Sequence, residues 1–163
     1  MGMPGCGKST WGKKLAQKIN FSFLDLDEFI ELKTGLSIAE LFSDKGEVFF
    51  REIETTYLNE IIASEKNLVV SLGGGTPCFN NNLKTIKANG KTIFLDAPVK
   101  LLADRIINAV TIRPMFKNLS REEIIEKLED LFLKRYPYYK EADITHQVKV
   151  LKLNHLLLSL ENK

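Results

Sequence analysis

The fold of this chain is decided by Gly2-Met3-Pro4-Gly5-Cys6-Gly7-Lys8-Ser9-Thr10, which matches the pattern G-x-x-x-x-G-K-[ST] of a phosphate-binding loop. Glycines in such a loop let the backbone curl, so that successive N–H groups point inward at a phosphate. Lys8 supplies positive charge for the β- and γ-phosphates, and the Ser9 hydroxyl is a ligand for Mg²⁺. The helix that follows directs its positive end at the same phosphates. The stretch therefore predicts nucleotide binding.

The composition is that of an ordinary globular protein. The chain has 163 residues, 44% apolar and 27% charged, which suits one domain with a sizeable core. The net charge of +2 gives no reason to expect a nucleic-acid partner. We see no signal peptide, and no apolar run approaches the ~20 residues of a membrane span. We therefore expect no membrane partner. Cys6 and Cys78 are the only cysteines, so we expect no disulfide framework and a cytoplasmic location.

Strands that alternate with helices predict an α/β fold with an open parallel sheet and helices on both faces. Hydrophobic periodicity predicts helices at residues 8–20, 28–33, 37–42, 47–64, 81–88, 99–109, 120–136 and 154–160. It predicts strands at residues 21–26, 68–72, 92–95 and 143–150. In open parallel sheets ligands collect at the carboxyl ends of the strands, where we expect the phosphate loop, two aspartates and a triple glycine to meet.

The two aspartates are Asp25 and Asp27, which stand two positions apart at the end of a strand. Because strand side chains alternate, we expect both to point the same way. One carboxylate would hold Mg²⁺ or its waters, and the other would accept the proton of an attacking hydroxyl. The alternative is a pair that caps the next helix. Gly73-Gly74-Gly75 follows a buried strand and permits close approach to a ligand, unless it is merely a flexible turn.

Arginines are the candidate anion-binding residues. Arg51 stands on a helix among aromatic residues, where it either offers a guanidinium fork to a carboxylate or forms a surface salt bridge with Glu47 or Glu54. Arg135 leaves the same two interpretations open. Arg113 lies in an irregular segment between two helices and suits a mobile lid at about residues 110–119, whose arginine reaches the transferring phosphate. The alternative is an exposed loop arginine.

Taken together, these residues resemble the shikimate kinase family, small kinases with the nucleoside-monophosphate-kinase fold. The matching segments follow one another in family order from residue 2 to about residue 145. The runs at 34–54 and 69–75 are the most specific of them. The segments are GMPGCGKST at 2–10, FLDLDEFIE at 23–31, TGLSIAELFSDKGEVFFREIE at 34–54, VVSLGGG at 69–75, TIRPMF at 111–116 and KRYPYY at 134–139.

The resemblance implies a monomeric enzyme that transfers phosphate from ATP, with Mg²⁺, to the 3-hydroxyl of shikimate in aromatic amino-acid biosynthesis. It implies catalytic roles for Lys8, Asp27 and Arg113. Contacts with ATP are implied for Gly5, Cys6, Gly7, Lys8, Ser9, Thr10, Arg105 and Arg113. Metal contacts are implied for Ser9 and, through water, Asp25. Substrate contacts are implied for Asp27, Arg51, Gly74, Gly75 and Arg135, with Phe42 and Phe50 nearby and the helical region at about 28–64 around them.

Two features depart from the family pattern. Residues 144–149 lack the usual loop that contacts adenine, and the strand that should precede the phosphate loop is missing. That strand is central in the family, so its loss would leave unpaired backbone edges. We therefore expect the natural chain to start upstream of Met1, and an extended version to be more stable and more active. The remaining alternatives are a gluconate-type kinase, which should lack the T-G-x-S-I and G-G-G runs, and a nucleotide-binding protein without catalysis.

Overall fold

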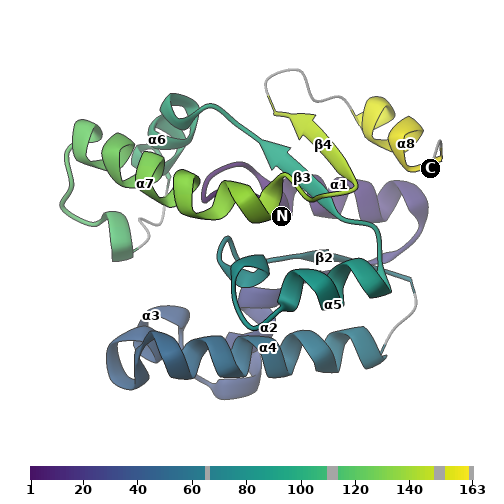
Figure 1. Ribbon diagram of the computed structural model, residues 1–163, viewed down its shortest axis with the longest axis horizontal. Coiled ribbons are helices and arrows are strands. Elements are labelled where there is room, and N and C mark those ends of the chain that lie inside the picture. The colour runs from purple at the N-terminus through teal and green to yellow at the C-terminus, as the bar shows by residue number, and fades with distance from the viewer. Residues whose placement is uncertain (65–66, 110–113, 149–152, 162–163) are drawn as a thin grey trace. The chain divides into compact units, whose positions relative to one another are not determined.

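The computed structural model describes residues 1–64, 67–109, 114–148 and 153–161 (Figure 1). The chain forms two compact units, which we call the terminal unit, Met1–Lys8 with Lys91–Lys163, and the middle unit, Ser9–Gly90. Helices alternate with parallel strands along the chain, so the predicted α/β class is confirmed. The organisation as one domain over residues 1–163 stays a prediction. Among the described helices, none is long and apolar enough to cross a membrane.

The middle unit is built on two parallel strands, β1 (Ser22–Asp25) and β2 (Leu68–Ser71), with Asp25 opposite Ser71 at their carboxyl ends. A 3₁₀ turn at Thr76–Cys78 follows β2, after the triple glycine. The helices of this part of the chain are α1 (Lys8–Ile19), α2 (Leu26–Thr34), α3 (Ile38–Glu40), α4 (Gly46–Ser64) and α5 (Asn82–Asn89). Both strands therefore end at the edge that carries the predicted acidic and glycine-rich segments.

Local sequence explains where the helices of the middle unit begin and end. α2 stops at Gly35, whose φ of 72° lies in the left-handed region that ends helices. Ser37 and Glu40 form a capping box that opens α3. A π-helical turn at Leu41–Lys45 then leads into α4. The core of the unit is apolar, with Leu15, Leu26, Ile30, Leu41, Phe50, Leu58 and Ile61 all buried.

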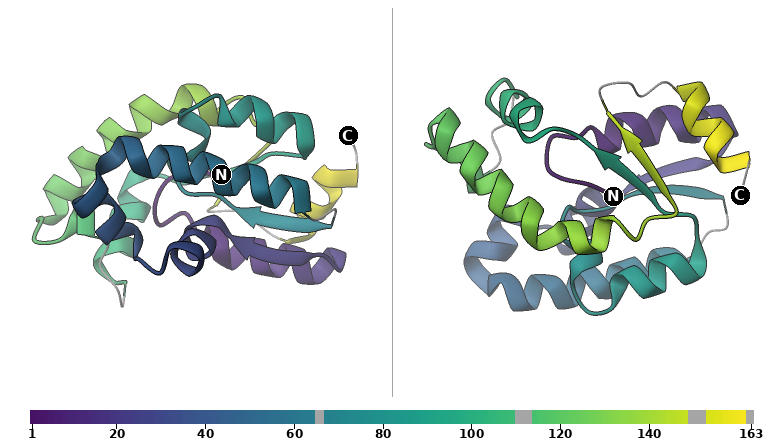
Figure 2. Two further views of the ribbon diagram at one scale, coloured as in Figure 1. Left: turned by 90° about the horizontal axis from the view of Figure 1, so that it is seen from below. Right: turned by 45° about the horizontal axis from the view of Figure 1, so that its top comes forward.

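The terminal unit is built on β3 (Ile93–Asp96) and β4 (Ile144–Gln147), which run side by side in the same direction (Figure 2). Its helices are α6 (Val99–Ile107), α7 (Arg121–Tyr139) and α8 (Leu153–Glu161), with a 3₁₀ turn at Pro114–Phe116. A capping box of Ser120 and Glu123 opens α7. The predicted strand at 143–150 is confirmed only over β4, and residues 149–150 lie outside the described residues.

Helix α7 is longer than the sequence predicts. It continues to Tyr139 although Pro137 lies inside it. The ring of Tyr139 is fully buried and stacks on Phe94 of β3, with 5.0 Å between ring centroids. Aromatic burial of this kind contributes several kcal/mol at about 25 cal/mol per Å², which outweighs the loss of one helical hydrogen bond at a proline. Tertiary packing therefore extends the helix past its local stop signal.

The expected single sheet is present as two pairs of strands in the described residues, β1–β2 and β3–β4. No strand precedes the phosphate loop in the sequence given, as predicted. Nevertheless, Met1 pairs with β3 through its backbone: its nitrogen donates to the oxygen of Ile93 at 2.6 Å, and the N–H of Leu95 donates to its oxygen at 3.0 Å. Met1 and Met3 are buried. The first residues thus anchor the phosphate loop to β3 without forming a strand.

Candidate active site

The phosphate loop turns tightly at its glycines. Gly5 and Gly7 have φ of 80° and 91°, which only glycine adopts at low cost. The N–H of Cys6 donates to the oxygen of Met3 at 3.3 Å and closes the turn. The Cys6 side chain is fully buried, so it fills space beneath the loop rather than facing a ligand. Its N–H is used within the turn and its thiol is buried, so the predicted contact of Cys6 with ATP stays a prediction.

Two cations lie against this loop. The Nζ of Lys8 donates to the backbone oxygens of Gly2 at 3.0 Å and Met3 at 3.2 Å. Arg105 is exposed on α6, and its Nη1 donates to the oxygen of Gly5 at 3.1 Å. Both side chains are thus held at the loop by carbonyl oxygens, which are weaker partners for a cation than phosphate oxygens. Two of the predicted ATP contacts, Lys8 and Arg105, therefore lie against the phosphate loop.

Ser9 and Asp25 form the candidate metal site. The Ser9 hydroxyl donates to Asp25 Oδ2 at 2.6 Å, and both side chains are partly exposed. Magnesium is a hard cation that prefers oxygen ligands and keeps several waters, so this pair fits it. Among the described residues, no group of three or more His, Cys, Asp and Glu side chains gathers to hold a metal ion. A metal here would therefore take most of its ligands from phosphate oxygens and water.

Asp25 and Asp27 do not lie on the same strand, so the alternation argument used for them is wrong. Asp25 ends β1 and caps α2, because its Oδ1 accepts the N–H of Asp27 at 3.1 Å. Asp27 is in the first turn of α2, where a carboxylate is favoured by the helix dipole. Asp25 therefore caps the helix, as in the alternative interpretation. Capping uses only one of its oxygens, so it is compatible with a role of Asp25 at the metal site. The same carboxylate also holds Ser9 through its other oxygen.

Arg51 is the centre of a buried polar cluster in the middle unit. Its side chain is only 10% exposed, and its Nη1 donates to Glu54 Oε2 at 2.8 Å. Glu54 is 1% exposed and accepts the Thr76 hydroxyl on its other oxygen at 2.7 Å. On the solvent side, Arg51 pairs with Glu47 at 3.1 Å. Both carboxylates considered in the sequence are therefore partners of Arg51, but the pair with Glu54 is buried rather than on the surface.

Three phenylalanine rings surround the guanidinium of Arg51. Its carbon Cζ lies 4.3 Å from the ring centroid of Phe79, 5.0 Å from that of Phe50 and 5.7 Å from that of Phe42. Cations and aromatic faces attract each other at such distances. Phe42 and Phe50, which we expect near the substrate, thus lie beside Arg51, and their nearness to a substrate stays a prediction. Phe79 was missed, and its only sequence signal is its place just after the triple glycine.

The triple glycine brings a backbone loop against this cluster. A β-carbon built on Gly75 would lie 2.6 Å from Arg51 Nη2, and one built on Gly73 would lie 2.9 Å from Asp27 Oδ1. At either position a side chain would force the neighbouring group to shift. The loop therefore brings Asp27 and Arg51, two predicted substrate residues, to one glycine-lined site with Gly74 between its two neighbours.

The family model for shikimate kinase matches residues 4–154, most of the chain. The chain belongs to the shikimate kinase family. A shikimate kinase of Azobacteroides pseudotrichonymphae is 40% identical over all 163 residues and 96% of its own length. A crystal structure of shikimate kinase from Bacteroides thetaiotaomicron matches with a TM-score of 0.95, 34% identity and coverage of 99% of this chain and 96% of that one. Shikimate kinase from Acinetobacter baumannii in complex with shikimate matches with a TM-score of 0.86, 37% identity and coverage of 99% and 92%.

Asparagines that the sequence analysis missed connect the glycine-rich loop of this shikimate kinase family member to α4. The Nδ2 of Asn80 donates to the backbone oxygen of Arg51 and to Thr55 Oγ1, both at 3.0 Å. The Nδ2 of Asn82 donates to Thr55 Oγ1 at 3.1 Å and to the oxygen of Thr76 at 3.0 Å. Thr55 is thus shared by both amides. Nothing in the local pattern distinguishes these asparagines from ordinary turn and cap residues, since only the folded loop brings them to Thr55.

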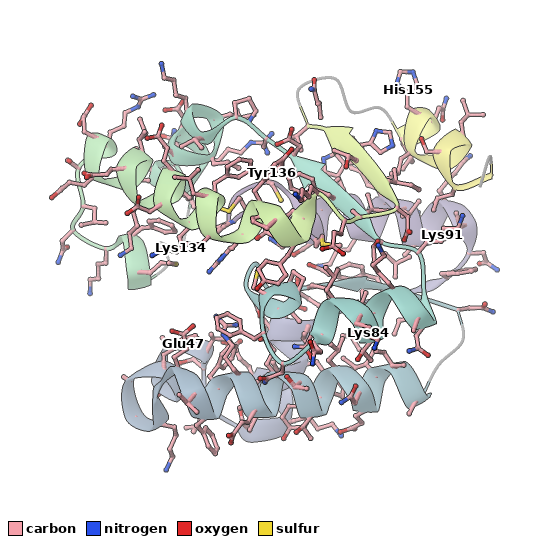
Figure 3. All side chains as sticks on the ribbon, in the orientation of Figure 1. Glu47, Lys84, Lys91, Lys134, Tyr136 and His155 are labelled. Atoms are coloured by element: carbon pink, nitrogen blue, oxygen red, sulfur yellow. The ribbon has the colours of Figure 1, made fainter. Side chains whose placement is uncertain are left out.

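Arg135 and Arg113, two further residues of the predicted site, have no contact with the cluster around Arg51 among the contacts of the described residues. Arg135 lies on α7 in the terminal unit, between Lys134 and Tyr136, which Figure 3 labels. Arg113 lies outside the described residues. The described part of the predicted lid is held to the terminal unit, because Phe116 is buried and Lys127 Nζ donates to the oxygen of Met115 at 2.7 Å. The roles of Arg113 and Arg135 therefore stay predictions.

Proposed function

We propose that this chain transfers the γ-phosphoryl group of ATP to the 3-hydroxyl of shikimate, giving ADP and shikimate 3-phosphate. The observation that carries the proposal is the guanidinium of Arg51, buried among phenylalanine rings next to Gly75. An arginine fork binds a carboxylate with two parallel hydrogen bonds, and shikimate bears a carboxylate and hydroxyls. Membership of the shikimate kinase family supports the same substrate, and so does the related kinase from Acinetobacter baumannii in complex with shikimate.

ATP is bound by the phosphate loop and the first turn of α1. Gly5, Cys6 and Gly7 curve the loop around the phosphates, with the N–H of Cys6 donating to the oxygen of Met3, and Lys8 exchanges its carbonyl partners for phosphate oxygens. Ser9 and Thr10 follow in the first turn of the helix, whose positive end favours the same anion. Arg105 contacts the nucleotide beside the loop. Arg113 reaches the transferring phosphate from a lid at 110–119, which closes over ATP.

Ser9 and, through a water molecule, Asp25 would hold Mg²⁺. Their fit to the ion rests on the hydrogen bond between two oxygen atoms at 2.6 Å. When bound, the ion neutralises charge on the β- and γ-phosphates and keeps them oriented. The protein's own contribution is to fix the Asp25 carboxylate, which caps α2 with one oxygen and accepts from Ser9 with the other.

Asp27 orients the 3-hydroxyl of shikimate and accepts its proton. The hydroxyl oxygen bonds to the γ-phosphorus, the bond from that phosphorus to the β–γ bridging oxygen breaks, and the proton passes to Asp27. Arg51 and Arg135 bind the carboxylate, and the backbone of Gly74 and Gly75 lies against the substrate. Lys8 and Arg113 stabilise the charge that develops on the transferred group.

We also propose that the chain works as a monomer in the cytoplasm and binds no nucleic acid. The net charge of +2 supports the absence of a nucleic-acid partner, because it indicates no strongly basic protein. The content of two cysteines supports a cytoplasmic location, because it indicates no disulfide framework.

A coupled assay of ADP release tests the proposed reaction with shikimate, gluconate and a nucleoside monophosphate as acceptors. We expect turnover that depends on shikimate. Equal or greater turnover with gluconate would overturn the choice of substrate. Binding of ATP without turnover on any acceptor would favour the alternative of a nucleotide-binding protein without catalysis.

A further inference from the structure

The edge of Arg51 that suits a carboxylate already holds one. Glu47 lies in the first turn of α4, one helical turn before Arg51 (Figure 3). Its Oε1 accepts from Arg51 Nε at 3.2 Å and from Arg51 Nη2 at 3.1 Å. These two N–H groups form one edge of the planar guanidinium, the edge on which arginine binds a carboxylate with two parallel bonds.

The two carboxylates at Arg51 differ in how firmly they are held. Glu54 is 1% exposed and is fixed by Thr76 as well as by Arg51 Nη1. Its displacement would leave a charge buried without a partner, which is strongly unfavourable. The Glu47 side chain is 56% exposed. The Glu47 carboxylate can therefore return to water, while Arg51 keeps Glu54 as its buried partner.

Charge also decides which group leaves. Glu47 and Glu54 together already carry more negative charge than Arg51 neutralises. A third carboxylate placed on the same edge, with Glu47 still there, would lie within a few ångströms of a like charge. A bound carboxylate and Glu47 therefore exclude each other at Nε and Nη2 of Arg51.

We infer that Glu47 is a displaceable counter-ion, which occupies the substrate-carboxylate edge of Arg51 and leaves it when the acceptor binds. The inference rests on the proposed function, since it assumes that the cluster takes a carboxylate-bearing acceptor. It assigns Glu47 a role in selectivity. A carboxylate replaces Glu47 in kind, whereas a neutral polyol offers the guanidinium no charge in exchange and leaves the ion pair of Glu47 and Arg51 in place.

Calorimetric titration with shikimate, without nucleotide, tests the inference on the wild-type chain and two matched variants. Glu47→Gln keeps the size of the side chain and removes its charge. Glu52→Gln makes the same change at an exposed position of the same helix, away from the ion pairs of Arg51. We expect Glu47→Gln to bind shikimate more tightly, by about twofold to fivefold, because no carboxylate then competes for Nε and Nη2 of Arg51. Glu52→Gln should stay within about twofold of the wild type, since exposed charges are screened.

The methyl ester of shikimate provides the second probe. Because it carries no charge, its affinity should be low for the wild type and should not rise in Glu47→Gln. Unchanged or weaker binding of shikimate to Glu47→Gln would overturn the inference, because Glu47 would then orient Arg51 rather than give way. A folded wild-type chain that binds no shikimate at all would overturn the proposed function itself. The titration of the wild type alone distinguishes this outcome from a failure of the inference about Glu47.

Discussion

Gly75 lies so close to Arg51 that a β-carbon at Gly75 would be 2.6 Å from Nη2 and 2.8 Å from Nη1 of the guanidinium. The backbone of the glycine-rich loop therefore covers the guanidinium directly. Arg51 itself is held by Glu54 and is buried, so it cannot move aside as a surface side chain would. The absence of a side chain at position 75 is thus a steric requirement of the anion-binding cluster.

We predict that Gly75→Ala weakens shikimate binding by about tenfold, since relieving such an overlap costs typically 1–3 kcal/mol and shifts Arg51. Calorimetry measures the affinity, and thermal melting shows whether the variant folds. Gly90→Ala is the matched control, because a β-carbon there meets nothing within 4 Å. Normal binding by Gly75→Ala would show that the cluster adapts and that the close approach is not needed.

We predict that Arg51→Ala weakens shikimate binding by roughly 2–3 kcal/mol or more, because it removes the partner of a carboxylate. It should also lower the free energy of unfolding by about 3–5 kcal/mol, since Glu54 is left buried without its cation. The double variant Arg51→Met with Glu54→Gln should recover much of that stability but none of the shikimate affinity. Urea unfolding and calorimetry separate the two effects. If the double variant bound shikimate normally, Arg51 would have only a structural role.

Lys8→Met should slow phosphoryl transfer by about 100-fold or more while leaving shikimate affinity unchanged. Lys8 contacts the phosphate loop, whereas Arg51 is held by Glu47 and Glu54. Single-turnover kinetics and calorimetric titration with shikimate report the two quantities. Lys18→Met makes the same change at an exposed position near the end of α1 and serves as the control. A rate close to that of the wild type in Lys8→Met would remove Lys8 from the catalytic set.

The regular elements were largely predictable, because their signals are local. Hydrophobic periodicity predicts the first residues of α4 and α7 to within one residue of those observed. The end of α7 was not predictable. It depends on the stacking of Tyr139 on Phe94, two residues that are far apart in the sequence.

Motifs in the sequence single out individual residues such as Lys8 and Arg51, whose functional roles stay predictions. The site was not predictable where folding chooses the partner. The buried pair of Arg51 with Glu54 and the exposed one with Glu47 are both at helical spacing, so only the burial of the folded protein distinguishes them. The direction expected for the Asp27 side chain is wrong for another reason. Strand alternation does not apply to Asp27, because this residue lies in the first turn of a helix.

We predict that the folded protein loses stability in acid because of His146 on β4. Burial, followed by the nearby charge of His155, lowers the pKa of His146 below the usual value of 6.5. Ser159 on α8 donates its single hydroxyl proton to the oxygen of His155 at 2.8 Å, so the His146 Nε2, 3.2 Å away, is the donor to Ser159 Oγ. Both the neutral and the protonated ring can donate this bond, so burial and His155 are what favour the neutral imidazole.

The sign of the effect follows from the lowered pKa. As the pH falls through about 6.5, the unfolded chain takes up a proton at this residue before the folded chain does, so stability is lost on acidification. Urea unfolding at about pH 7.5 and about pH 5.5 should show this loss in the wild type and a smaller one in His146→Gln. His155→Gln should fall between them, because it removes only the second cause of the shift. If His146→Gln lost as much stability on acidification as the wild type, the packing of α8 on β4 would have no part in it, and the loss would have to come from carboxylates elsewhere.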